Sequence, residues 1–407
     1  MTTEAHIILE DGTKFKGVSF GGNNTAFGEI VFNTSMTGYQ EILTDPSYAG
    51  QIVVPTYPMI GNYGISKEAN ESAKIQVAGL VVRQHCEEPS HADSKMSVSD
   101  FLHSQDVTGI SEIDTRALTR HIRKEGVMMG TIVTNTNIDE ATTDLAKITP
   151  YGNVNYVQKV STEDPYKWEN PATSKMKILV ADFGLKYNIL RLLRNRDCAV
   201  HVYPSDASSV ELLDLSPDGI LLSPGPGDPQ LLNYMVETTR NLLGRVPILG
   251  ICLGNQVLGM ATGAKTYKLK FGHRGGNHPV KDLESGKIHI TSQNHGYAID
   301  ESTLPSDVSI THVSANDNTV EGIKHRTIPA MGIQYHSESS PGPKDNEYIF
   351  DPVELLRDNK HTDFYRASCG LLSGILLSAG VPEGSRASLA DIVSRKGKMR
   401  KLVGPGR

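Results

Sequence analysis

The sequence predicts an α/β protein in which a β-rich N-terminal domain precedes a domain built on a mostly parallel sheet. From residue 176 onward, short apolar runs alternate with segments of helical periodicity. Strands that are apolar throughout pair in parallel beneath helices on both faces of a sheet. The first half instead carries short strand-like runs separated by turn residues. A chain of 407 residues is long enough for two or three domains.

The first half contains a predicted hairpin, further short strands and one helix. The hairpin covers residues 5–20, with its turn at Asp11-Gly12, and strands are expected at 29–32, 51–55 and 76–82. The helix begins after Asp114 and ends at Gly126, with Leu118 and Ile122 on one face. Residues 1–150 are predicted to form the first domain. Residues 151–175 are polar, contain Pro and Gly and show no sustained period, so they are interpreted as a linker.

The second domain, residues 176–357, follows a strand–helix rhythm. Strands are predicted at 177–181, 199–203, 219–222 and 247–251, and helices at 187–196, 208–214, 231–243 and from 253. Ligands of parallel sheets bind beyond the carboxyl ends of the strands. Two motifs, at 223–229 and 252–256, fall at that edge, which predicts a site there.

Cys252 is the candidate nucleophile. An apolar strand runs directly into Gly250-Ile-Cys-Leu-Gly254 and then into a helix. Glycines around a tight strand-to-helix turn let a nucleophile stand clear of the sheet, and a helix N-terminus favours a thiolate. A free cysteine is more often a small buried hydrophobe. Here the flanking glycines leave little for it to pack against.

His336 and Glu338 are the candidate partners of Cys252. They follow an apolar run at 331–335, and residues two apart on an extended segment point to the same face. A carboxylate there can orient the imidazole that deprotonates the thiol. A His-x-Glu pattern is weak by itself in a chain with 14 histidines. The cysteine elbow makes it stronger.

Five motifs carry a resemblance to a known family. They are GICLGNQ at 250–256, SPGPGDP at 223–229, TSQNHGYA at 291–298, YHSESSPGP at 335–343 and FNTSMTGYQEILTDPSYAGQIV at 32–53. The first four resemble the class I, triad-type glutamine amidotransferases. The last resembles the small, glutamine-hydrolysing subunit of carbamoyl-phosphate synthase. The resemblance covers residues 1 to about 357.

The resemblance implies a glutaminase with a Cys252–His336–Glu338 triad that passes ammonia to a separate large subunit, which makes carbamoyl phosphate from bicarbonate and two ATP. The Gly225 and Leu253 N–H groups would form the oxyanion hole. The glutamine-binding positions implied are Ser47, Gly225, Gly227, Leu253, Gln256, Asn294, Gly296 and Tyr297. The product would serve arginine or pyrimidine biosynthesis, a choice that the sequence leaves open.

No cofactor or metal is expected in this chain. Its glycine clusters do not match a Walker A loop, so ATP and its divalent metal are expected in the large subunit, with which this chain would form at least a heterodimer. Cys86, Cys198, Cys252 and Cys369 have neither disulfide nor metal-ligand spacing.

Composition narrows the class of protein. A net charge of −6 without a basic stripe argues against a nucleic-acid partner. No apolar run has the length of a membrane span, and residues 1–10 lack a signal-peptide pattern, so we expect a cytoplasmic protein.

Three features depart from the family pattern. Asn255 stands where the family usually has histidine, and Ser337 stands where it has proline. The tail at 358–407 has no family counterpart and is predicted to be a disordered extension or an additional docking element. Two alternatives are a stand-alone γ-glutamyl hydrolase, against which the first domain argues, and a non-catalytic regulatory subunit, against which the three triad residues argue.

Overall fold

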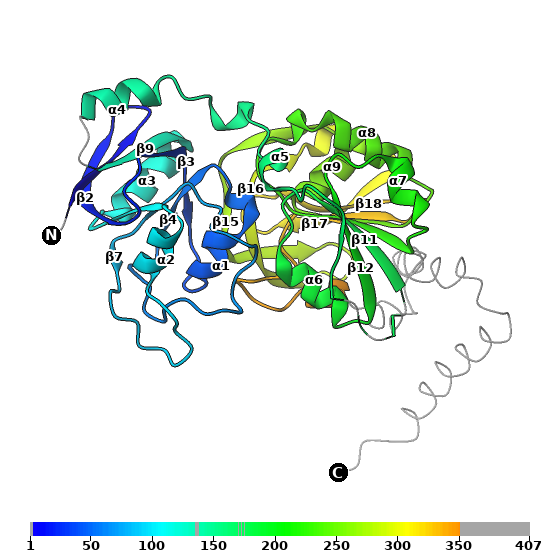
Figure 1. Cartoon of the computed structure of the whole chain (residues 1–407). Coiled ribbons are helices and arrows are strands. Elements are labelled where there is room, and N and C mark those ends of the chain that lie inside the picture. The colour runs from blue at the N-terminus through cyan, green and yellow to red at the C-terminus, as the bar shows by residue number, and fades with distance from the viewer. Residues whose placement is uncertain (1–2, 135–137, 170, 172, 175, 351–407) are drawn as a thin grey trace, which may run out of the picture.

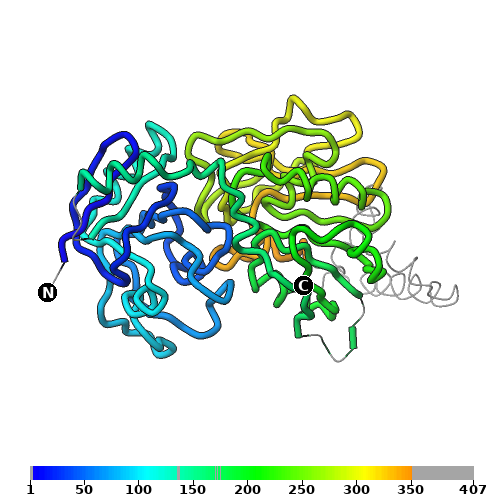
Figure 2. Tube along the Cα trace, turned by 45° about the horizontal axis from the view of Figure 1, so that its top comes forward, coloured from blue at the N-terminus to red at the C-terminus, as the bar shows by residue number. Residues whose placement is uncertain are grey.

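The computed structural model describes residues 3–134, 138–169, 171, 173–174 and 176–350, which form two lobes lying side by side (Figures 1 and 2). The predicted tail at 358–407 lies outside the described residues. No helix in the described ranges is both long and apolar enough to cross a membrane.

The first lobe is a closed barrel with the strand order β1-β2-β8-β6-β4-β3-β9. The predicted hairpin is present as the antiparallel pair β1–β2, and β3, β4, β6 and β8 pair in parallel. Because β9 pairs with both β1 and β3, the barrel strands leave no free sheet edge. The strands are β1 (Glu4–Leu9), β2 (Lys14–Gly21), β3 (Ala26–Asn33), β4 (Gln51–Pro55), β6 (Gly79–Val81), β8 (Thr108–Ser111) and β9 (Met128–Thr134).

Short helices surround this barrel. They are α1 (Tyr39–Thr44), α2 (Val98–Ser104), α3 (Thr115–Glu125) and α4 (Ile138–Leu145), together with the small strands β5 (Met59–Ile60) and β7 (Gln84–His85). The predicted helix is α3. Asp114 caps it by accepting a hydrogen bond from the Ala117 N–H, and Gly126 ends it with a φ of 110°. A 3-10 turn, η1 (Pro46–Tyr48), follows α1 and carries Ser47.

The second lobe is one 10-stranded sheet with the order β10-β12-β11-β13-β14-β19-β18-β17-β15-β16. Its core runs parallel from β12 through β11, β13 and β14 to β19, and antiparallel strands extend it on both sides. The parallel strands are β11 (Met176–Asp182), β12 (Cys198–Pro204), β13 (Gly219–Leu222), β14 (Ile248–Ile251) and β19 (Ala330–Ile333). The antiparallel strands are β10 (Tyr166–Lys167), β15 (Thr266–Asp282), β16 (Ile288–Ile299), β17 (Val308–Ser314) and β18 (Val320–His325).

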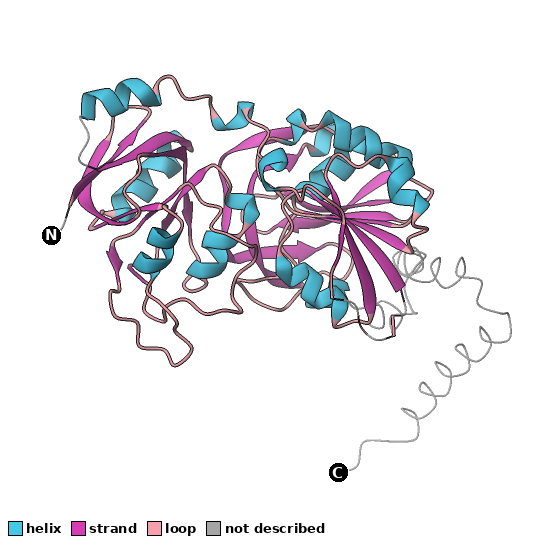
Figure 3. Ribbon diagram, viewed as in Figure 1, coloured by secondary structure: helices cyan, strands magenta, loops and turns pink. Residues whose placement is uncertain are grey.

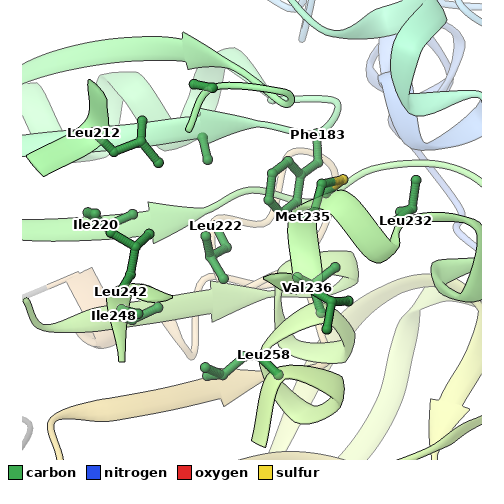
Figure 4. Close-up of a cluster of buried hydrophobic side chains, with 14 of the residues drawn as sticks. Phe183, Leu212, Ile220, Leu222, Leu232, Met235, Val236, Leu242, Ile248 and Leu258 are labelled. Atoms are coloured by element: carbon green, nitrogen blue, oxygen red, sulfur yellow. The ribbon is translucent and has the colours of Figure 1, made fainter. Parts of the chain in front are cut away.

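Helices cover both faces of this sheet (Figures 1 and 3). α6 (Tyr187–Arg194) packs Ile189 and Leu193 onto one face. On the other face lie α7 (Ser209–Asp214), α8 (Asn233–Leu242) and α9 (Leu253–Thr262). Their side chains meet those of the strands in the cluster shown in Figure 4, where Leu212, Val236 and Leu258 pack near Ile220 and Ile248. The parallel sheet with two helical layers is therefore present as predicted.

The segment interpreted as a linker, 151–175, has more structure than its composition suggests. It contains η2 (Tyr151–Asn153), α5 (Val157–Val160) and β10, which pairs with β12. Val157 is fully buried in the core of the second lobe. Hydrophobic periodicity does not reveal such elements, because none of the three has more than four residues and a period shows only over a longer window.

Candidate active site

Cys252 lies at a strained elbow between β14 and α9. Its φ of 54° and ψ of −107° are rare for a residue with a side chain. The neighbouring glycines explain how the turn fits. An added Cβ on Gly250 would lie 2.4 Å from Gly254 O, and one on Gly254 would lie 2.1 Å from Leu222 O. The predicted elbow is therefore present. Because α9 packs so closely on the sheet, positions 250 and 254 require glycine.

His336 and Glu338 follow β19, the strand next to β14. The His336 N–H donates to Ser292 O at 2.8 Å, which fixes this segment against β16. The two side chains contact each other, with His336 Nδ1 2.6 Å from Glu338 Oε1. All three of Cys252, His336 and Glu338, here called the Cys–His–Glu array, are buried.

A buried lysine completes the charges around this array. Lys186, between β11 and α6, places its Nζ 3.0 Å from Glu338 Oε1 and donates to Ser339 O at 2.5 Å. Burial alone would lower the pKa of Lys186, but the carboxylates of Glu338, Asp45 and Glu71 outweigh it and raise that pKa. Lys186 is therefore a fully buried ammonium group.

The charges of the array reinforce one another. Burial opposes ionisation of Glu338, but Lys186 and then His336 outweigh it and lower the Glu338 pKa to about 2. Burial also opposes the charged form of His336 and by itself would lower the His336 pKa. Glu338 and then Cys252 outweigh burial and raise that pKa above its ordinary value. Among the described residues His336 Nε2 has no regular hydrogen-bond partner. An imidazole held in this way can exchange a proton with a group at Nε2.

A pocket opens beside Cys252, between the two lobes. The predicted residues that line it are Ser47, Gly225, Gly227, Cys252, Gln256, Asn294, Gly296 and Tyr297. Leu253, His336 and Glu338 do not line it. Leu253 nevertheless adjoins Gly225, since a Cβ added to Gly225 would lie 2.8 Å from Leu253 Cδ2 and 2.1 Å from Phe183 O. This close approach requires glycine at position 225.

Several buried polar atoms around this pocket lack a hydrogen-bond partner within the described part of the chain. They are Ser47 Oγ, Gln51 Oε1, Arg274 Nε and Asn294 Nδ2. An unpaired buried donor or acceptor costs about 1–3 kcal/mol. A small ligand rich in polar groups would relieve this cost. The set includes donors and acceptors, as an amino acid with a side-chain amide requires.

Sequence reasoning missed other residues of the pocket and of its surroundings. Glu29 and Lys268 face each other across the lobes with Nζ 2.7 Å from Oε1, and Tyr151 accepts a bond from the Gly227 N–H at 3.0 Å. These residues belong to no motif, so only their tertiary contacts identify them. Lys186 did leave a signal, because it follows an apolar strand at its carboxyl end.

The two single-residue departures from the family pattern, Asn255 and Ser337, are buried close to the array. Asn255 packs against the bare backbone of Gly332, where an added Cβ would lie 2.2 Å from Asn255 Oδ1. Ser337 is fully buried, and its Oγ has no hydrogen-bond partner among the described residues.

A second buried cluster lies behind Asn294. The ligand-type atoms of His273, His295 and Glu321 lie within 4.8 Å of one another, although no metal motif was predicted. They bond to one another and to neighbours: His273 Nε2 lies 2.8 Å from Asp317 Oδ2, and His273 Nδ1 lies 3.2 Å from Glu321 Oε1. His295 bonds to Tyr297 O through Nδ1 at 2.8 Å. This network holds the β16 segment that carries Asn294, Gly296 and Tyr297.

Comparison of the sequence with family models and curated relatives agrees with this architecture. Residues 7–132 match the family described as carbamoyl-phosphate synthase small chain, CPSase domain, and residues 179–355 match glutamine amidotransferase class-I. A carbamoyl phosphate synthase small chain from Solidesulfovibrio magneticus is 48% identical over 368 residues, covering 87% of this chain and 98% of that protein. A pyrimidine-specific small chain from Halalkalibacterium halodurans is 47% identical over 358 residues, covering 87% and 98%. A solved glutamine amidotransferase from Thermotoga maritima has a TM-score of 0.34 and 20% identity, covering 49% of this chain and 96% of that one.

The second lobe, with its cysteine elbow, is thus a class I glutamine amidotransferase domain. A barrel lobe of the CPSase-domain type precedes it. The chain as a whole belongs to the carbamoyl phosphate synthase small-chain family.

Proposed function

We propose that this chain is the amidotransferase subunit of a glutamine-hydrolysing carbamoyl-phosphate synthase, and that Cys252, His336 and Glu338 carry out the hydrolysis. The observation on which this rests is the Cys–His–Glu array, in which a histidine held at 2.6 Å by a buried carboxylate interacts with a cysteine on a strained elbow. The membership of the small-chain family supports the same activity.

The chemistry proceeds in two halves. The Cys252 thiolate attacks the carboxamide carbon of glutamine, and the C–N bond breaks as the His336 imidazolium protonates the leaving nitrogen, releasing ammonia. Water then attacks the γ-glutamyl thioester while His336 accepts its proton. The C–S bond breaks, and glutamate leaves. Glu338 stays ionised throughout and holds the imidazole in place.

The pocket residues hold the glutamine. The N–H groups of Gly225 and Leu253 would donate to the oxygen that becomes negative in each tetrahedral intermediate. Ser47, Gly227, Gln256, Asn294, Gly296 and Tyr297 would bind its amino, carboxylate and amide groups.

Ammonia then passes to a large subunit, with which this chain forms a heterodimer in the cytoplasm. The large subunit supplies the sites for ATP and the divalent metal, so this chain works without a cofactor of its own. The first lobe distinguishes this proposal from a stand-alone γ-glutamyl hydrolase, because such an enzyme has no need of the barrel lobe. The intact array distinguishes it from a non-catalytic regulatory subunit.

The test is a comparison of nitrogen donors in the complex with the large subunit. Cys252→Ser is expected to abolish carbamoyl-phosphate synthesis from glutamine while synthesis from ammonia continues at close to the parent rate, because a serine hydroxyl is not activated by the same imidazole. Glutamine-dependent synthesis at the parent rate in this variant would refute the proposal.

A further inference from the structure

Gln334 contacts the nucleophile from a side that the proposed mechanism does not use. It follows β19 directly and is fully buried. Its Nε2 lies 3.8 Å from Cys252 Sγ. The family motifs that identified the array do not include this residue.

The hydrogen bonds around Gln334 determine which end of its amide faces the sulfur. Gln256 donates through Nε2 to Tyr297 O at 2.8 Å, and a backbone carbonyl can only accept, so this atom of Gln256 is an NH₂ group. The same NH₂ group donates to Gln334 Oε1 at 3.2 Å, and Asn255 Nδ2 donates to that oxygen at 3.1 Å. The oxygen end of Gln334 is therefore occupied by two donors, and its NH₂ end faces Cys252 Sγ.

The other polar neighbours of the sulfur do not supply a donor that stays in place throughout the reaction. Cys252 Sγ donates its own proton to Asn294 O at 3.6 Å, and a carbonyl oxygen offers nothing to the sulfur once that proton has gone. His336 gives up its proton to the leaving ammonia. The Gln334 NH₂ group cannot be lost in this way, because an amide does not ionise.

We propose that Gln334 is a catalytic residue that donates an N–H hydrogen bond to the sulfur of Cys252 when the sulfur is anionic. This inference rests on the proposed function. The bond stabilises the thiolate before attack on glutamine, and it stabilises the thiolate again when the thioester is hydrolysed. Because Gln256 lies in the pocket and anchors Gln334, the same hydrogen-bond chain connects the substrate site to the nucleophile.

The test measures the thiol itself and needs no glutamine. Alkylation of Cys252 by iodoacetamide is followed against pH by mass spectrometry of the Cys252 peptide, in the full chain bound to its large subunit. Gln334→Glu keeps the shape and the acceptor for Asn255 and Gln256, but it presents an oxygen to the sulfur. Gln334→Leu removes both polar ends. We expect the pH of half-maximal alkylation to rise by about one unit or more in each variant, a roughly tenfold loss of rate at neutral pH.

Asn255→Ala is the matched control, because it removes a donor to Gln334 Oε1 while Gln256 still holds the amide. Its alkylation profile should coincide with that of the parent. His336 and Tyr48, the titrating groups that interact with Cys252, are unchanged in every variant. An unshifted profile in Gln334→Glu, or an equal shift in Asn255→Ala, would overturn the proposal.

Far-UV circular dichroism of each variant checks that it folds. The two substitutions at position 334 differ in chemistry, so either folded variant is sufficient for the test. The proposed function fails separately, if Cys252→Ser still hydrolyses glutamine.

Discussion

Lys186 is the residue on which the ionisation of Glu338 most depends. It is fully buried, and its Nζ lies 3.0 Å from the carboxylate. Removing one partner of such a pair leaves the other charged in a medium that solvates it poorly. Lys186 therefore couples the stability of the fold to the chemistry of the Cys–His–Glu array.

Lys186→Met should lower the free energy of unfolding by about 3–5 kcal/mol, because Glu338 would keep only His336 as a counter-charge. Urea unfolding monitored by circular dichroism measures this. Lys16→Met serves as the control, since the Lys16–Glu4 pair lies at the surface and should have no measurable effect. Equal stabilities of parent and Lys186→Met would show that the buried pair contributes nothing.

Glu338 should also make the fold sensitive to acid. Its pKa is about 2 in the folded protein against an ordinary 4.5, so its stabilising contribution is complete above pH 4.5 and is lost as the pH falls toward 2. Between these pH values the melting temperature of the parent should fall more steeply than that of Glu338→Gln. Parallel melting curves for the two proteins would contradict the depressed pKa.

Local motifs made part of the site predictable from sequence. Cys252 lies between two glycines, and His336 and Glu338 are two residues apart. These spacings indicate candidate catalytic residues. Neither Lys186 nor Gln334 belongs to such a motif, although Lys186 does follow an apolar strand. Their roles depend on contacts with residues 152 and 82 positions away, which no local pattern encodes.

At the scale of elements, α9 and the sheet position the nucleophile together. The close packing at Gly254 brings the first turn of α9 against the carboxyl end of β13. The helix therefore cannot move without moving Cys252.

Gly254→Ala should displace α9 and impair both stability and glutamine turnover. The new Cβ would lie 2.1 Å from the backbone oxygen of Leu222, and overpacking of this kind costs about 1–3 kcal/mol. Gly276→Ala is the control, because its nearest neighbours would lie 3.6 Å away. Thermal unfolding and steady-state kinetics of both variants test this. A Gly254→Ala protein with parent stability would mean that the helix moves freely.

The elements that sequence predicted best are those with an unbroken pattern. The apolar strands β11, β13 and β14 and the amphipathic helices α3 and α6 each bury a continuous face. The long pair β15–β16 was missed. Its alternation is interrupted by glycines and by register shifts after Lys268 and Gly275, and partly exposed strands lack a strong apolar period.

At the scale of the whole molecule, the site belongs to neither lobe alone. Ser47, Gln51 and Glu29 come from the barrel lobe, whereas the remaining lining residues come from the second lobe or from Tyr151. Glu71 joins the lobes as well, because it accepts hydrogen bonds from Arg191 Nη1 at 2.9 Å and Ser340 Oγ at 2.7 Å.

The second lobe expressed alone, residues 176–407, should bind glutamine at least about tenfold more weakly than the full chain. It would lack one wall of the pocket and the hydrogen bonds that this wall supplies. Calorimetric titration of both forms, each carrying Cys252→Ser to prevent turnover, measures the difference. Equal affinities would mean that the first lobe only docks the large subunit.

The shared counter-charges of Lys186 have a consequence for regulation. Two of the carboxylates that keep this lysine protonated, Asp45 and Glu71, come from the barrel lobe, and the third is Glu338. Separation of the lobes would thus remove negative charge from behind the lysine as well as a wall from the pocket. The position of the barrel lobe therefore affects both the pocket and the charges around the Cys–His–Glu array, so a partner bound to the barrel would influence glutamine hydrolysis without contacting Cys252.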